Sequence, residues 1–159
     1  MNMRAAFTRI LFPTDFSATS LGALPYALFL ADTFDARLHV LHVVDEASMY
    51  WTAMGPEGAP IGPGIDDLMV LGQTRMDAFA REHLQKLKLP AKVEVRTGRP
   101  FAEIISYARE HLIDVIVQAT HGRGAIAHML LGSTAEKVVR KAPCPVLTVR
   151  TSGHEFVMP

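Results

Sequence analysis

Short runs of aliphatic and β-branched residues alternate with longer stretches of helical periodicity along all 159 residues, and this alternation is the strongest constraint on the fold. It predicts βα units around a parallel sheet, an α/β fold. All but one of the runs are almost continuously apolar, as strands covered by helices on both faces must be. The third alternates charged residues with valine and is expected at an edge. The five expected strands are 10–12, 37–43, 92–96, 114–119 and 145–149.

Four stretches between these strands have the apolar spacing of amphipathic helices. The first contains Pro25, which predicts a kink, because an interior proline removes a backbone hydrogen bond and costs about 3 kcal/mol. Leu71 in the second helix and Leu112 in the third are expected to face the core. The helices are expected to begin at Ser17, after Asp66 and Asp67, at Pro100, and near Gly132 and Ser133.

One long segment, residues 46–65, is rich in glycine and proline and interrupts this rhythm. At about 20 residues it exceeds an ordinary connection, so it is either functional or disordered. Its apolar residues allow two interpretations, an insertion resting on the domain surface or a lid that closes over a ligand; they are Met49, Tyr50, Trp51 and Met54. No repeat or second domain is visible, so residues 1–159 are expected to form one domain.

The charge balance argues against several classes of function. Sixteen Lys and Arg residues balance sixteen Asp and Glu residues, so the chain lacks the positive field needed for non-specific nucleic-acid or membrane-surface binding. No apolar run approaches the roughly 20 residues that span a bilayer. With a single cysteine, Cys144, interpreted as a structural thiol, the sequence predicts a cytoplasmic protein with neither nucleic-acid nor membrane partners.

Two segments that follow strands carry residues suited to a ligand. In an open parallel sheet, ligands bind beyond the carboxyl ends of the strands. The segment 119–124 and the helix start at Ser133 and Thr134 combine small residues, hydroxyl groups and unpaired amides, which is typical of a phosphate site. Asp15, after the first strand, is suited to a ribose hydroxyl or a phosphate-bound metal, although a turn or capping role explains it equally well.

Several stretches together resemble the universal stress protein family, and the resemblance covers nearly the whole chain. Residues 10–17 are similar to the family's first strand and the loop after it, and residues 142–149 to its last strand. The family's nucleotide motif is glycine, two residues, glycine, nine residues, glycine, then serine or threonine. Here the same register starts at Ala119 instead of glycine and continues with Gly122 and Gly132-Ser133.

The resemblance implies an open sheet with strand order 3-2-1-4-5, of the Rossmann-like, adenine nucleotide alpha hydrolase-like type, with helices on both faces. It implies a homodimer that pairs through the C-terminal strand, and ATP as the ligand, with Mg²⁺ or Mn²⁺. The residues that it implies for nucleotide binding are Pro13, Thr14, Asp15, Val43, Ala119, Thr120, His121, Gly122, Arg123, Gly124, Ala125, Gly132, Ser133, Thr134 and Ala135.

Ala119 is the departure from the family pattern. If its position needs a positive φ, alanine is strained there by about 1 kcal/mol, and its methyl group crowds the ligand. Binding is still favoured, because the other motif positions are present and alanine is the smallest replacement.

Three functional hypotheses follow, and no catalytic constellation emerges from the residues. The first is an ATP-binding sensor that is non-catalytic or hydrolyses ATP very slowly. The second is a nucleotide-free dimeric interaction module of the same fold, and the third is a nucleotide hydrolase. His121 and His128 have a poor spacing for metal ligands, and His42 is expected to be a buried, hydrogen-bonded side chain. Arg123 is interpreted either as a phosphate contact or as a solvated side chain.

Overall fold

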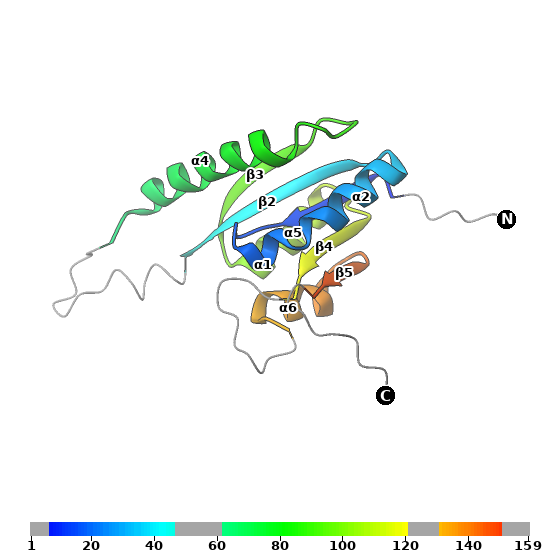
Figure 1. Ribbon diagram of the computed structural model, residues 1–159. Coiled ribbons are helices and arrows are strands. Elements are labelled where there is room, and N and C mark those ends of the chain that lie inside the picture. Colours follow the sequence, from blue (N-terminus) through cyan, green and yellow to red (C-terminus); the bar gives the residue numbers. More distant parts are fainter. Residues whose placement is uncertain (1–6, 47–61, 121–130, 151–159) are drawn as a thin grey trace.

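The computed structural model describes residues 7–46, 62–120 and 131–150 (Figure 1). Its five strands form one sheet in the order β3-β2-β1-β4-β5, and every neighbouring pair is parallel. The predicted α/β class and the strand order implied by the family resemblance are therefore confirmed.

The strands lie close to the predicted runs, with small differences at their ends. They are β1 Arg9–Pro13, β2 Arg37–Asp45, β3 Lys92–Gly98, β4 Val115–Ala119 and β5 Val146–Val149. The helices of the described residues are α1 Ala18–Leu21, α2 Leu24–Phe34, α4 Ile65–His83, α5 Pro100–Glu110 and α6 Ser133–Lys141.

Two apolar clusters hold helices against the two faces of the sheet. Side chains alternate across a strand, so Ile10 and Phe12 of β1 point to one face and Leu11 points to the other, and all three are fully buried. Ile10 and Phe12 pack in a cluster with residues of α2 and α4, whereas Leu11 packs with residues of α5 and α6. The strands at the centre of the sheet are therefore covered on both sides, which explains their continuous apolar runs.

The first predicted helix is divided in two, which corrects the expected kink at Pro25. Ser17 caps α1 as predicted, its hydroxyl accepting from the amide of Ser20 at 3.1 Å. The chain then turns at Gly22 and Ala23, and α2 begins with Pro25 in its first turn. Amides in the first turn have no partner within the helix, so proline there removes no hydrogen bond.

Two leucines expected to face the core do not. Leu71 of α4 is exposed, and the core side of this helix is formed by Gly72, Met76 and Phe79. Leu112 follows α5 with φ 49°, a left-handed conformation, and is 68% exposed. The turn that this conformation makes points Ile113 into the core instead.

The two edges of the sheet are β3 and β5, as predicted for the third strand. The side chains of β3 after Lys92 are half-buried, whereas those of β4 are all buried. None of the helices in the described ranges is both long enough and apolar enough to cross a membrane.

Candidate functional site

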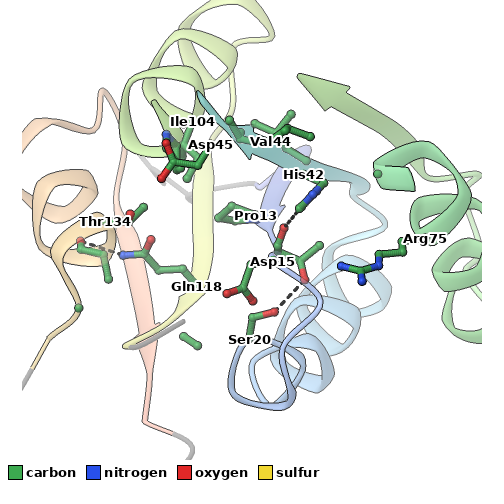
Figure 2. A pocket seen from close by; sticks show the side chains of 18 of the residues that line it. Pro13, Asp15, Ser20, His42, Val44, Asp45, Arg75, Ile104, Gln118 and Thr134 are labelled. Carbon is green, nitrogen blue, oxygen red and sulfur yellow. Dashed lines mark hydrogen bonds between the residues drawn. The ribbon is translucent and has the colours of Figure 1, made fainter. Parts of the chain in front are cut away.

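A cavity of about 600 Å³ lies where β1, β2 and β4 end, at the point where the strand order reverses between β1 and β4 (Figure 2). It brings together most of the predicted site residues from three separate parts of the chain. Those that line it are Pro13, Thr14, Asp15, Val43, Ala119, Gly132, Ser133, Thr134 and Ala135. The predicted residues 121–125, with His128, lie outside the described residues, as do Trp51 and its neighbours.

Asp15 lies on the cavity wall and also shapes the loop after β1. Its Oδ1 accepts a hydrogen bond from the amide of Ser17 at 2.9 Å, which is the predicted turn role. The Thr14 hydroxyl, which is buried, lies 2.8 Å from the hydroxyl of Ser20 and accepts from the amide of Phe16 at 3.0 Å. These bonds orient the loop before any ligand arrives, so the turn role and a ligand role for Asp15 are compatible.

Phe16 holds an unusual backbone conformation beside this cavity. Its φ is 60°, a region that bulky residues rarely adopt. The ring packs against His42 at 4.5 Å and Phe79 at 6.0 Å between centroids, contacts that offset the backbone strain. His42 in turn donates from Nδ1 to the carbonyl oxygen of Thr14 at 2.8 Å, which confirms its predicted hydrogen bond, but the side chain is half-buried rather than buried. The β1 loop is therefore fixed to the end of β2.

Ala119 occupies a regular position at the end of β4. It pairs with Val149 of β5, and its φ is not positive. The backbone strain considered for an alanine at this motif position therefore does not arise. Thr120, which is also buried, continues the pairing by donating its amide to the carbonyl oxygen of Val149 at 3.0 Å.

The start of α6 faces the cavity and is held there by β4. The amide of Gly132 donates to the carbonyl oxygen of Thr120 at 2.7 Å, and the buried side chain of Gln118 donates to the carbonyl oxygen of Ala135 at 3.1 Å. The backbone of Gly132 serves as the N-cap, with no side-chain cap at this end. The first-turn amides of α6, together with Ser133 and Thr134, therefore offer donors at the positive end of the helix dipole.

Sequence reasoning missed the contribution of α4 and of Gln118. Arg75 points into the cavity from α4 and adds a positive charge to its wall (Figure 2). Gly72 allows α4 to lie this close, since a Cβ there would meet the Val95 side chain at 3.1 Å and the His42 ring at 3.3 Å. One signal was available in the sequence. Gly72 and Arg75 interrupt the apolar side of a helix, and a glycine there indicates that another element packs closely against the helix.

Within the described residues, neither Cys144 nor a cluster of metal ligands contributes to the cavity. Burial raises the pKa of Cys144, as a structural thiol requires, and no group of three or more His, Cys, Asp or Glu residues in the described ranges could hold a metal ion. The described wall of the cavity therefore combines hydrogen-bond donors from a helix start and a guanidinium with a carboxylate that accepts hydrogen bonds.

Known proteins resemble this chain over nearly its whole length. A sequence model of the universal stress protein family matches residues 6–150. Universal stress protein MJ0531 of Methanocaldococcus jannaschii is 31% identical over 156 residues, which cover 94% of this chain and 85% of that protein. The chain belongs to the universal stress protein family.

Solved structures of universal stress proteins share this fold. MJ0577 of the same archaeon superposes with a TM-score of 0.74 at 27% identity, covering 94% of this chain and 99% of that one. A universal stress protein in complex with cAMP gives a TM-score of 0.60 at 22% identity, covering 92% and 99% of the two chains. An Arabidopsis thaliana family member with AMP bound gives 0.56 at 17% identity, covering 91% and 92%.

Proposed function

We propose that this universal stress protein binds ATP in the cavity at the carboxyl ends of β1, β2 and β4. The observation that carries the proposal is the placement of Asp15 and the start of α6 on the same cavity of about 600 Å³. A carboxylate suits ribose hydroxyls, and helix-start amides suit phosphates. Two proteins of the same fold, described above, hold cAMP and AMP, which supports an adenine nucleotide as the ligand class.

Each part of the nucleotide has a group of residues assigned to it in this proposal. Pro13, Asp15 and Val43 contact adenine and ribose, and Ser133 to Ala135 bind phosphate oxygens together with the segment 119–125. Mg²⁺ or Mn²⁺ is held mainly by the phosphates, as is usual for ions that keep several of their waters.

Occupancy of the cavity, rather than turnover, is proposed as the signal. None of the hydrogen bonds given above joins a hydroxyl of the described lining to a carboxylate or imidazole base, which favours a sensor over a hydrolase. A nucleotide joins residues of β1, β2 and α6, so bound and free states present different surfaces to partner proteins.

Two measurements test this proposal. Mass spectrometry of the denatured protein is expected to detect a copurified adenine nucleotide. Calorimetry is expected to show ATP binding to the wild type and its loss in Gly122→Val, where a branched side chain blocks the phosphates. The control is Gly64→Val, because a Cβ at Gly64 would meet only the Asp67 side chain, at 3.9 Å. A folded Gly122→Val protein with unchanged affinity places the site elsewhere.

A nucleotide-free interaction module is the second candidate, and the change of the first motif glycine to Ala119 favours it. It predicts no copurified nucleotide and no heat of ATP binding. A hydrolase instead requires multiple-turnover formation of ADP or AMP.

A further inference from the structure

A second cavity, of about 510 Å³, opens at the opposite end of the strands, where β1, β2 and β3 begin. Positive side chains reach it from all three strands: Arg9, Arg37 and Lys92. The proposed nucleotide site lies beyond the other ends of these strands, so the two cavities are separated by the length of the sheet.

Strand register gathers these positive charges on one face. Arg9 is the cross-strand partner of Arg37, and His39 is the partner of Lys92. Arg37 and His39 are two residues apart, so the four side chains share the face that α5 covers. Like charges directly opposite each other destabilise a sheet. A cluster of this kind is therefore stabilised by an anion.

The carboxylates near the cavity already have partners, and Glu94 lies 3.9 Å from Nε2 of His111 on its wall. Glu110, which lines it, pairs with Arg96 at 2.7 Å, and Asp114 accepts from the backbone amides of Thr8 and Arg9 at 2.7 and 2.9 Å. Within the described residues, no carboxylate forms an ion pair with Arg37 or Lys92.

Two of the positive groups are held at the wall of the cavity. Nη1 of Arg9 donates to the carbonyl oxygens of His111 and Leu112 at 3.2 and 3.5 Å. Nζ of Lys92 lies 3.4 Å from both ring nitrogens of His111. A ligand would therefore meet Arg9 and Lys92 already positioned, at a reduced cost in side-chain entropy for these two groups.

A buried histidine, His39, lies beside these positive groups. His39 donates or accepts a hydrogen bond with the Tyr107 hydroxyl at 3.0 Å and is 4% exposed. Burial, followed by the positive charges of His111, Lys92, Arg37 and Arg9, lowers the pKa of His39 to about 4. An anion in the cavity would oppose those charges and raise this pKa.

The cavity also has an apolar part. Leu89 and Leu112 both line it, and they are 38% and 68% exposed. We propose that this cavity is a second binding site, which takes a small organic dianion: a phosphate group contacts Arg37 and Lys92, and an apolar or aromatic group packs on the two leucines. Arginine presents a planar pair of donors that suits phosphate oxygens.

Phenyl phosphate is the probe, and NMR of the histidine rings is the local readout. Binding is expected to raise the pKa of His39 and to shift the resonances of His111, more strongly at low salt. Inorganic phosphate is expected to bind more weakly, and phenol not to bind. Resonances near Ser133 report separately on any phosphate at the nucleotide site, so the two sites are distinguished.

Arg37→Gln is expected to weaken phenyl phosphate binding about tenfold, as the loss of a charged hydrogen bond predicts. The matched control is Arg81→Gln, because Arg81 is an exposed arginine on α4 that lines neither cavity. Lys92→Gln serves as the second variant if Arg37→Gln fails to fold, and ATP binding should be unchanged in all three. Histidine resonances that stay fixed through a titration into the millimolar range overturn the proposal, as does equal affinity in the wild type and these cavity variants.

Discussion

The amide of Gly132 lies 2.7 Å from the carbonyl oxygen of Thr120, and this hydrogen bond joins the start of α6 to the end of β4. The residues that it connects are twelve apart in sequence. The bond therefore places the N-terminus of α6 at the carboxyl ends of the strands, where Asp15 also lies. Segments that are far apart in the sequence thus line the same cavity.

Gln118→Leu is expected to lower stability and to weaken nucleotide binding together. The substitution removes the buried hydrogen bond to the carbonyl oxygen of Ala135, at a cost of about 1–3 kcal/mol in the free energy of unfolding. Urea unfolding and ATP calorimetry measure the two effects. The matched control is Gln73→Leu, since Gln73 bonds only to Asp77 on the exposed surface of α4. Equal losses of ATP affinity and of unfolding free energy in the two variants would show that Gln118 does not position α6.

Ala119→Gly is expected to leave ATP affinity unchanged and to lower the free energy of unfolding by about 1 kcal/mol. Ala119 is extended and paired in β4, where glycine adds conformational freedom to the unfolded chain and relieves no strain. Calorimetry and thermal unfolding check the two parts. A marked gain in affinity would mean that the methyl group of Ala119 obstructs the ligand.

Leu147→Lys is expected to convert a homodimer into a monomer. β5 is an edge strand, and Leu147 is 39% exposed on it. An open apolar edge favours pairing with a second copy, and a buried lysine at that contact opposes it. Light scattering of the wild type and the variant decides the question. A wild type that is monomeric at micromolar concentrations contradicts the prediction.

Stability is expected to fall as pH drops from about 6.5 to about 4, through the titration of His39. The folded pKa of His39 is about 4 against 6.5 for a free histidine, so in this range only the unfolded chain takes up the proton. The loss approaches about 3 kcal/mol once the pH is below both values. Urea unfolding across this range measures it. His39→Gln keeps a hydrogen-bonding partner for Tyr107 without titrating, and an equally steep pH dependence in that variant would exclude His39.

Trp51 fluorescence is expected to change when ATP with Mg²⁺ binds. Trp51 is the only tryptophan, and its segment follows β2, which lines the proposed nucleotide site through Val43. Closing of that segment over the nucleotide would exclude water and slow release. Emission is followed during an ATP titration. A flat trace at a concentration where calorimetry shows saturation assigns the segment no part in sensing.

Sequence reasoning predicted the fold well because parallel strands buried on both faces leave continuous apolar runs. It failed at Pro25 and Leu112 for local reasons. Whether a proline interrupts a helix or begins one depends on where the chain turns, here at Gly22 and Ala23. Leu112 has the spacing of a core residue on the helix. Its left-handed conformation after α5 instead leaves Leu112 exposed and buries Ile113.

The segments that line the cavity after β1 and at the start of α6 were recognisable by residue type, whereas the α4 wall of the cavity was not. Asp15 and Ser133-Thr134 come after strands β1 and β4, so a parallel sheet implies that they lie at the same carboxyl ends of the strands. Arg75 lies in the middle of a helix, and its position on the cavity depends on how closely α4 packs on β2 and β3 at Gly72.

The amino-acid sequence by itself determined the βα alternation, the cap at Ser17 and the small and hydroxyl-bearing residues proposed to hold a phosphate, because these depend on neighbouring residues. Only the tertiary structure decided which charges meet across strands. Arg9, Arg37 and Lys92 are far apart in the chain and become neighbours through the register of β1, β2 and β3. Register is a property of the whole packed sheet, and for that reason no local pattern in the sequence encodes the second cavity.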